Sequence, residues 1–488
     1  MKNDFDRIEK KIQQGPYTDT WDSLSNMQVP SWFSKAKFGI FIHWGLYSIA
    51  GHNNEWYSRN MYMQGTEEWE YHRKTYGEHT KFGYKDFISL FKAEQFKPLE
   101  WAKLFAEAGA KYLVMVAEHH DGFQMYRSHI SRYNVVTMGA HRDILGELKT
   151  ACLQQGLHFG ASSHRAEHWF FMSHGKEFES DIKQELHRGD FYWPAMPEPD
   201  HQHLQSRPYP SEEFLQDWFL RTCEIIETYM PEILYFDWWI EHEAFKPYLK
   251  KIAAYYYNLG KEYHMQTAIC YKHDAMIWNS GIPDIERGSF ADVKPYYWQT
   301  DTSIARNSWC YTDTLDYKSA EEIICMLIDV VSKNGNLLLN IGPKGDGSIP
   351  ETDTYILKQI GAWLQINGEA IYESHVWRIS EEGPTKIKEG QFTDAKAISY
   401  KENDFRFTAK GGFLYVFAMK YPKHGKITVK SLAKSKDQNL PYFHGLIENV
   451  IVLGEKKLPK WSIDYDGLHL DMQIEERKLP VVIKVQVK

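Results

Sequence analysis

Cysteine and long apolar runs are both scarce in this sequence of 488 residues. Its five cysteines are far apart and form no CxxC pair, so we expect buried free thiols in a reducing compartment rather than a disulfide framework. No apolar run approaches the roughly 18 residues that a membrane span needs. The first residues, MKNDFDRIEKK, contain no apolar segment of a signal peptide. We therefore expect a cytoplasmic protein without a membrane partner.

Excess positive charge is missing as well. Lys and Arg number 57 against 65 Asp and Glu, a formal net charge of -8, whereas nucleic-acid binding requires a clustered positive field. The sequence has no HExxH zinc motif, no GxSxG nucleophile elbow and no Gly-rich phosphate loop after its first apolar run. We therefore expect no nucleic-acid partner, no metal and no organic cofactor.

Aromatic residues and histidine, by contrast, are abundant. The chain has 17 Trp, 31 Tyr, 26 Phe and 22 His. Rings and imidazoles together suit a pocket that holds a polar molecule with an apolar face, and sugars are the common example. This composition favours a carbohydrate site.

Short apolar runs alternate with helical patterns from about residue 35 to 370. The expected strands are Gly39–Trp44, Tyr112–Glu118, Leu157–Ser163, Ile233–Asp237, Thr267–Tyr271 and Asn336–Ile341. The expected helices are Pro98–Ala108, Arg142–Gln155, Ser211–Tyr229 and one that begins at the capping box of Ser319 and Glu322. Such alternation predicts a parallel sheet, either open and doubly wound or closed into a barrel.

The pattern changes near the end of the chain. Short alternating runs at 413–418, 426–430 and 481–487, separated by turn residues, predict an antiparallel β-sandwich. We therefore predict two domains, an α/β domain over residues 1–375 and a β-domain over 376–488.

Ionisable residues stand at the ends of four expected strands. They are His43, the run Glu118 to Asp121, His164 and Asp237. Each alone has an ordinary explanation as a buried ion-pair partner or helix cap, but a parallel barrel keeps its catalytic groups at the carboxyl ends of its strands. Because neighbouring side chains on a strand point to opposite faces, we expect at most one of His119 and His120 to face the site.

Two carboxyl groups are candidates for acid–base and nucleophilic chemistry. Asp237 lies among Phe236, Trp238 and Trp239, and Glu286 lies in the segment PDIERG. Such a pair performs retaining glycoside hydrolysis when the groups stand about 5 to 5.5 Å apart and have different pKa values. Sequence alone does not show that they approach each other, and without other information Glu286 is more simply a surface loop residue.

Long blocks around these residues resemble the retaining α-L-fucosidases of glycoside hydrolase family 29. The blocks are WFSKAKFGIFIHWGLYSIAGHNNEWYSRNMY (32–62), AEAGAKYLVMVAEHHDGFQMYRSHISRYNVV (106–136), ILYFDWWI (233–240), WQTDTSIARNSWCY (298–311), VVSKNGNLLLNIGPKGDGSIP (330–350) and WLQINGEAIYES (363–374). They follow one another in the family's order from about residue 30 to 375. The remaining residues match the family's C-terminal β-domain by position and pattern only.

The resemblance implies a (β/α)8-like barrel followed by an antiparallel β-sandwich. It implies exo-acting removal of terminal α-L-fucose from a fucosylated oligosaccharide or glycoconjugate, with retention through a covalent fucosyl-enzyme. Asp237 matches the nucleophile, and we choose Glu286 as the acid/base over Asp284 and Asp292. The residues that match fucose contacts are His43, Glu55, Trp56, His119 and His120, with Trp298 as an aromatic of the site wall.

Two segments depart from the family pattern. Lys272, in AICYKHDA, stands where many members carry an arginine, and lysine cannot make the same forked contact. The segment GASSHRAEHWFF lacks a tyrosine common in the family, so we expect His164 or Glu167 to take its place at the substrate. Two other functions stay open: a catalytically silent fucose-binding protein, and a related retaining exo-glycosidase for another sugar. The sequence also leaves open whether the protein is a homo-oligomer.

Overall fold

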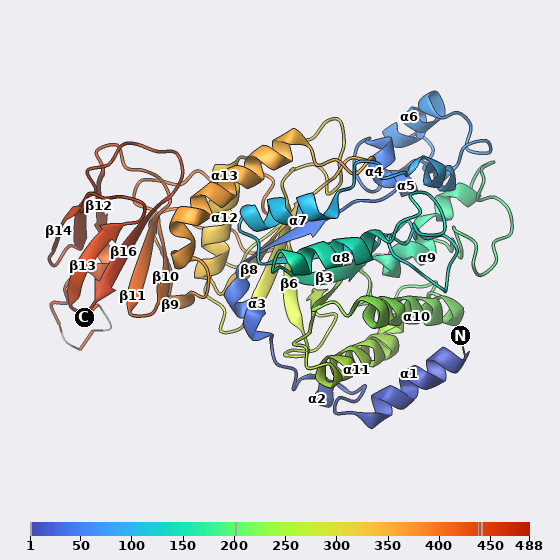
Figure 1. Ribbon diagram of the computed structural model, residues 1–488, viewed down its shortest axis with the longest axis horizontal. Helices are drawn as coiled ribbons and strands as arrows, with labels where there is room; N and C mark the ends of the chain where they lie inside the picture. Colours follow the sequence, from blue (N-terminus) through green and yellow to red (C-terminus); the bar gives the residue numbers. More distant parts are fainter. Residues whose placement is uncertain (1, 201–202, 438, 441–442) are drawn as a thin grey trace.

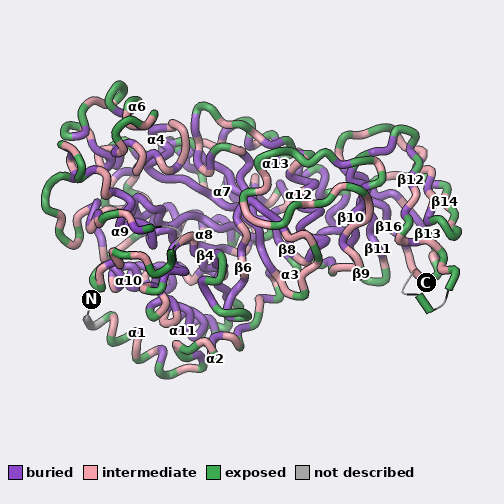
Figure 2. The backbone as a smooth tube through the Cα atoms, turned by 180° about the vertical axis from the view of Figure 1, so that it is seen from behind, coloured by how far each residue is buried: buried purple, intermediate pink, exposed green. Residues whose placement is uncertain are grey.

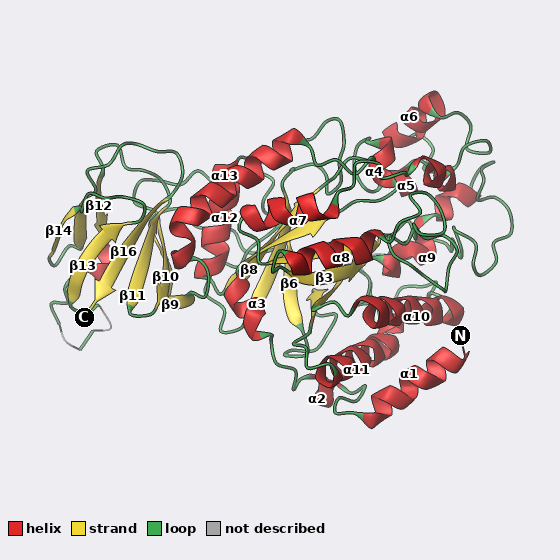
Figure 3. Cartoon of the chain, in the orientation of Figure 1, coloured by secondary structure: helices red, strands yellow, loops and turns green. Residues whose placement is uncertain are grey.

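The computed structural model describes residues 2–200, 203–437, 439–440 and 443–488. Eight parallel strands, each hydrogen-bonded to the next, form a closed barrel inside a ring of helices (Figures 1 and 3). The strands are β1 (Phe38–Ile42), β2 (Tyr112–Glu118), β3 (His158–Ser163), β4 (Ile233–Phe236), β5 (Ala268–Lys272), β6 (Ile282–Glu286), β7 (Trp298–Ser303) and β8 (Gly335–Ile341). Pairing of β1 with β8 closes the barrel.

The longer helices lie on the outside of the barrel. They are α1 (Lys2–Gln14), α6 (Glu67–Thr75), α7 (Pro98–Glu107), α8 (Ile144–Gln154), α10 (Glu212–Tyr229), α11 (Lys246–Glu262), α12 (Ala320–Ser332) and α13 (Glu351–Asn367). Shorter helices are α2 (Trp21–Leu24), α3 (Ser31–Ala36), α4 (Tyr47–Ala50), α5 (Tyr57–Asn60) and α9 (His168–Phe171). Among the described residues, none of these helices is long and apolar enough to span a bilayer.

The helices predicted from sequence begin and end within two residues of their expected limits. The capping box of α12 is present: Ser319 Oγ accepts from the Glu322 N–H at 3.2 Å, and Glu322 Oε2 accepts from the Ser319 N–H at 2.8 Å. All six expected strands are present too. The five cysteines are buried and form no disulfide, as predicted.

Two barrel strands, β6 and β7, were not predicted. Their sequences, IPDIE and WQTDTS, contain no continuous apolar run. All six residues of β7 are nevertheless buried, because polar side chains inside the barrel bind one another; Gln299 Nε2, for example, donates to Asp284 Oδ2 at 2.8 Å. Burying a polar side chain is costly unless it is hydrogen-bonded. Because these polar side chains bind one another, the strand can be buried without an apolar sequence.

The C-terminal domain is the predicted β-sandwich. One sheet has five antiparallel strands in the order β13-β16-β11-β10-β9, and the other has three in the order β12-β15-β14. The strands are β9 (His375–Glu382), β10 (Phe405–Lys410), β11 (Phe413–Ala418), β12 (Lys426–Val429), β13 (Ile447–Val452), β14 (Lys460–Ile463), β15 (Leu468–Asp471) and β16 (Val481–Val487). Phe407 and Val416 of the larger sheet share a buried cluster with Val429 and Leu470 of the smaller. Figure 2 shows that the chain is largely buried along β10, β11 and β16.

The β-domain packs against α12 of the barrel. Arg406 of β10 is buried, and its Nε lies 2.6 Å from Oδ1 of Asp329 in α12. The other oxygen of Asp329 pairs with Lys333 Nζ at 2.7 Å. Arg406 Nη2 also lies 3.2 Å from Glu381 Oε2, so an ion network of four residues joins the two domains.

Candidate active site

The carboxyl ends of the barrel strands surround one pocket of about 240 Å³. It is lined by His43, Glu55, Trp56, His119, His120, His164, Asp237, Trp238, Glu286, Asp301, Trp309 and Phe392. Every site residue predicted from the sequence is among them except Trp298. Closure of the barrel brings together residues that lie up to 266 positions apart, from His43 to Trp309, and a loop of the C-terminal domain adds Phe392.

Asp237 follows the last residue of β4 and lines the pocket. His164 Nδ1 lies 3.1 Å from its Oδ2, and His120 Nε2 lies 3.5 Å from the same oxygen. Burial by itself would raise the pKa of Asp237, but the electrostatic influence of His164, His120 and Lys272 outweighs burial and holds this pKa well below its usual range. Asp237 is therefore ionised at neutral pH.

Glu286 is the last residue of β6 and is only 7% exposed, so its interpretation as a surface loop residue was wrong. Trp238 Nε1 donates to its Oε2 at 2.6 Å. Burial, with repulsion from Asp301 and Asp237, raises the pKa of Glu286 to about 8 against the opposing effect of Lys272. Glu286 is therefore protonated at neutral pH.

The other two acid/base candidates do not line the pocket. Asp284 is buried below it, where its oxygens accept from Lys272 Nζ at 2.8 Å and Gln299 Nε2 at 2.8 Å. Asp292 is exposed in the loop after β6. Among the three, only Glu286 can reach a molecule in the pocket.

Lys272, at the end of β5, is completely buried beneath the carboxyl groups. Its Nζ lies 2.8 Å from Asp284 Oδ1, 2.7 Å from Asp301 Oδ1 and 3.4 Å from Glu286 Oε2. Burial would lower the pKa of Lys272, but attraction to the acidic groups around it, chiefly Asp284 and Asp301, outweighs burial and raises the pKa well above its usual value. The lysine is thus a fixed positive charge that touches Glu286.

The histidines are held as neutral rings. Burial lowers the pKa of His43 and His119 well below the usual value and that of His120 to about 4. His43 Nδ1 lies 2.7 Å from Asn340 Oδ1, which fixes that nitrogen as the donor and leaves Nε2 as an acceptor. Neutral imidazoles of this kind both donate to and accept from sugar hydroxyls.

The expectation that only one of His119 and His120 faces the site was wrong, since both line the pocket. Strand β2 ends at Glu118, and the two histidines lie in the turn that follows. The alternation of side chains holds only within a strand, so it does not apply to them.

The histidines also have a geometry that could hold a metal ion. One ligand nitrogen from each of His43, His119 and His164 lies within 4.8 Å of the others, and so do atoms of His120, His164 and Asp237. Three imidazole nitrogens are a donor set that zinc accepts. The sequence did not indicate this cluster because its members follow three different strands. That the protein needs no metal stays a prediction.

Glu55 and Glu167 are buried acids near the pocket. Glu55 Oε2 accepts from the Trp309 N–H at 3.0 Å, and burial raises the pKa of Glu55. Glu167 Oε2 lies 3.8 Å from His120 Nδ1, and burial with repulsion from Asp237 raises its pKa well above the usual value. Of the two candidates for the missing tyrosine, His164 lines the pocket and Glu167 lies behind His120.

Trp298 lies outside the site, which corrects its expected role in the site wall. It is the first residue of β7, about 17 Å along the strand from the carboxyl end. Its Nε1 donates to the Lys333 carbonyl at 3.0 Å, and its ring packs on Phe290. Trp309, which lies in the same sequence block, lines the pocket instead.

Sequence reasoning did not single out Asp301, Trp309 or Phe392. Asp301 could have been found by placing WQTDTS on a strand, which would have put it next to Glu286 in the register of β6 and β7. Trp309 carried a signal as an aromatic within a block that resembles the family. Phe392 carried none, because it belongs to a loop between two strands of the C-terminal domain.

A closed parallel barrel whose pocket holds an ionised aspartate and a protonated glutamate, among neutral imidazoles and indoles, defines a glycoside hydrolase. The family model for α-L-fucosidase matches residues 5–369. The chain belongs to the α-L-fucosidase family.

Relatives and solved structures agree with this membership. Human tissue α-L-fucosidase is 30% identical over 472 residues, which cover 93% of this chain and 88% of that protein. Human plasma α-L-fucosidase is 31% identical over 381 residues, covering 74% and 73%. The crystal structure of Thermotoga maritima α-fucosidase superposes with a TM-score of 0.76 at 29% identity, covering 96% of this chain and 100% of that one. The same protein in complex with fucose gives 0.75, with the same identity and coverage.

Proposed function

We propose that this chain is an exo-acting α-L-fucosidase that hydrolyses terminal α-L-fucosides with retention, through a covalent fucosyl-enzyme. Its substrates are fucosylated oligosaccharides or glycoconjugates. The observation that carries the proposal is the opposite displacement of two pKa values in one pocket, down for Asp237 and up for Glu286. Family membership supports the choice of sugar, and a pocket of only about 240 Å³ supports action on a single terminal residue.

In the first step, Asp237 attacks the anomeric carbon while the bond from that carbon to the leaving oxygen breaks. Glu286 gives its proton to the leaving oxygen, so the aglycone departs as a neutral alcohol. In the second step, the Glu286 carboxylate takes a proton from water, and the resulting hydroxide displaces Asp237 from the anomeric carbon. Two inversions give net retention, and both carboxyl groups return to their starting states.

The remaining polar residues of the pocket bind the sugar in this proposal. His43, His119 and His120 face the fucose hydroxyls as neutral rings, and His164 lies beside them against Asp237. Glu55 accepts a further hydroxyl, held in place by the Trp309 N–H. Trp56 and Trp309 supply ring faces for the C6 methyl and the apolar patch of fucose, the part that we first expected Trp298 to play.

Initial rates on 4-nitrophenyl α-L-fucoside test the nucleophile. We expect Asp237→Ala to lose several orders of magnitude in kcat, because the covalent step has no substitute. Asp292→Ala, which removes an exposed carboxylate outside the pocket, is the control and should keep wild-type rates. Near-normal turnover by Asp237→Ala would refute the assignment. A parallel assay on the α-galactoside separates fucose from a sugar with a C6 hydroxyl.

Azide tests the acid/base. Glu286→Ala should lose most on substrates with poor leaving groups, since those need a proton. Azide needs no general base, so it should restore deglycosylation and yield a fucosyl azide. An equal loss on all leaving groups, with no azide product, would remove Glu286 from this role.

A further inference from the structure

The loop between β9 and β10, residues 383–404, runs from the C-terminal domain back to the active site. Phe392 in this loop lines the pocket, although its side chain is 57% exposed. Its ring lies nearly parallel to that of Trp238, at an interplanar angle of 11° with centroids 6.3 Å apart. The β-domain therefore contributes an aromatic ring at the mouth of a site otherwise made by the barrel.

Phe392 and Trp238 lie on one particular side of the pocket. Trp238 Nε1 donates to Glu286 Oε2, and the Phe392 N–H donates to the Glu286 carbonyl at 2.9 Å. An acid that protonates the leaving oxygen must stand beside that oxygen. Because the Trp238 and Phe392 rings lie next to the acid Glu286 on its solvent side, they face the leaving group.

The backbone of Phe392 is held in an uncommon conformation. Its φ is +52°, a left-handed value that a bulky residue rarely adopts. Two hydrogen bonds over-determine the geometry: one from the Phe392 N–H, and one from the Thr393 N–H to the Arg287 carbonyl at 2.8 Å. Hydrogen bonds hold this exposed aromatic residue in a strained conformation, which is typical of residues that contact a ligand rather than the protein core.

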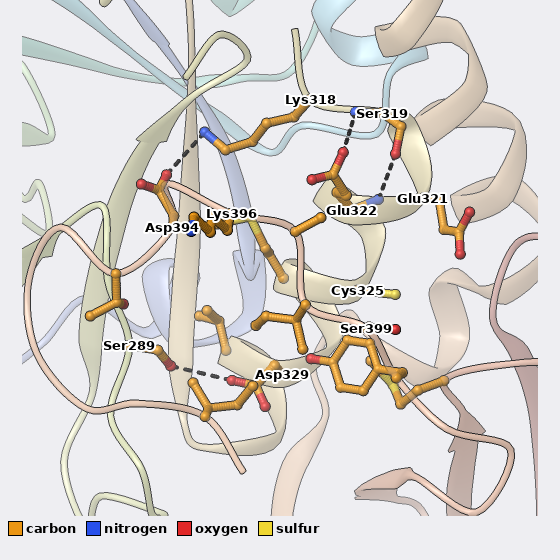
Figure 4. Close-up of a pocket in the computed structure, with 18 of the residues that line it drawn as sticks. Ser289, Lys318, Ser319, Glu321, Glu322, Cys325, Asp329, Asp394, Lys396 and Ser399 are labelled. Carbon is orange, nitrogen blue, oxygen red and sulfur yellow. Dashed lines mark hydrogen bonds and ion pairs between the residues drawn. The ribbon is translucent and has the colours of Figure 1, made fainter. Parts of the chain in front are cut away.

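Asp394 anchors the loop beside Phe392. Its oxygens lie 2.9 Å from Lys318 Nζ and 3.1 Å from Arg287 Nε, and Thr302 Oγ1 donates to it at 2.5 Å. Figure 4 shows Lys318 directed at Asp394 in the wall of a second cavity of about 390 Å³, which lies on the side of the loop toward α12. The loop thus separates this cavity from the active-site pocket and is fixed by a buried ion cluster.

We propose that Trp238 and Phe392 form the subsite for the leaving group, and that this subsite selects leaving groups with a flat apolar face. A pyranose ring of the next sugar and an aryl ring both have such a face. The inference rests on the proposed function, because it uses Glu286 as the acid. It makes the C-terminal domain a determinant of substrate choice.

Three fucosides separate stacking from proton donation. Methyl α-L-fucoside has a poor leaving group without a ring, 4-nitrophenyl α-L-fucoside has a good leaving group with a ring, and a fucosyl-galactose disaccharide combines a poor leaving group with a ring. We expect Phe392→Ala to lower kcat/KM about threefold to tenfold on the nitrophenyl substrate and the disaccharide. The methyl glycoside should be unaffected.

Two further variants complete the experiment. Phe392→Trp keeps an aromatic face and should retain the preference for ringed leaving groups. Tyr465→Ala removes an equally exposed aromatic from β-domain residues outside the pocket and should match the wild type on all three substrates.

Other results would refute either the subsite or the proposed function. Loss on the methyl glycoside and disaccharide, with the nitrophenyl substrate spared, would mean that Phe392 acts only through Glu286, and the subsite would be refuted. Unchanged ratios among the three substrates would refute it as well. Failure of the wild type to hydrolyse α-L-fucosyl fluoride, which needs neither acid nor subsite, would instead overturn the proposed function, and the subsite with it.

Discussion

At the scale of residues, one buried environment gives two carboxyl groups opposite properties. Burial raises the pKa of Asp237 and Glu286 alike, so the difference between them comes from their neighbours. Asp237 faces imidazoles, whereas Glu286 faces the carboxylates of Asp301 and Asp237 itself. Lys272 lowers the pKa of both carboxyl groups, but at Glu286 burial together with repulsion from Asp301 and Asp237 outweighs its effect. The charges of the residues around each carboxyl group therefore set which of the two attacks the sugar and which donates a proton.

These pKa values predict the pH dependence of kcat/KM. Glu286 must be protonated to act as an acid, so activity should fall as pH rises through about 8. Asp237 must be ionised, and because its pKa is lowered, the acidic limb should lie below the usual range of an aspartate. The profile on 4-nitrophenyl α-L-fucoside should therefore be bell-shaped, with a wide plateau.

Fucosyl fluoride provides the control for this profile, since fluoride leaves without a proton. The basic limb should weaken or disappear on this substrate and persist on a disaccharide. A basic limb of the same size on both substrates would assign it to a group other than Glu286.

At the scale of elements, the loop 383–404 is held to the barrel mainly by polar contacts. Asp394 pairs with two cations that belong to the barrel, and the backbone of the loop hydrogen-bonds to the backbone of Glu286, Arg287 and Ser289 at and after the end of β6. Such contacts are directional, so they fix the position of Phe392 more narrowly than apolar packing would.

Removal of Asp394 should therefore both destabilise the protein and release the loop. Asp394→Ala leaves Lys318 and Arg287 buried without this partner, and we expect a loss of about 3 to 5 kcal/mol in the free energy of unfolding, measured in urea. The pKa of Asp394 is lowered in the fold, so the stability it contributes is present above its unfolded pKa and is lost as pH falls through its folded pKa.

Lys386→Ala, in the same loop, is the matched control. Lys386 is 71% exposed and pairs with Glu381, so its removal should change the urea midpoint very little. If Asp394→Ala behaved like this control, the ion cluster would not be the anchor of the loop.

At the scale of the whole molecule, the barrel and the β-domain unfold as one unit if the network of Arg406, Asp329 and Lys333 couples them. Arg406→Met keeps much of the bulk of the side chain but removes its charge, so that Lys333 is the one cation left beside Asp329. We expect a loss of about 3 to 5 kcal/mol and two separate transitions in calorimetry. Arg73→Ala, at an exposed ion pair of α6, should leave a single transition. A single unshifted transition in Arg406→Met would show that apolar packing alone joins the domains.

Local patterns were enough to predict most strands of the barrel and four of its outer helices. The limits of α7, α8, α10 and α12 followed from capping residues and apolar periodicity, and six barrel strands followed from short apolar runs. Those patterns failed for β6 and β7, whose polar residues are satisfied only by partners on other strands.

By itself, the sequence determined the alternation of strands and helices, the C-terminal β-domain and the placing of His43, His164 and Asp237 at strand ends. These features depend on interactions between residues near one another in the chain. The tertiary structure alone decided that Glu286 is buried beside Asp237, that Trp298 lies far from the site, and that Phe392 reaches the pocket. The reason is physical: burial, pKa and contact across domains depend on which segments the closed barrel brings together, and no local pattern encodes that.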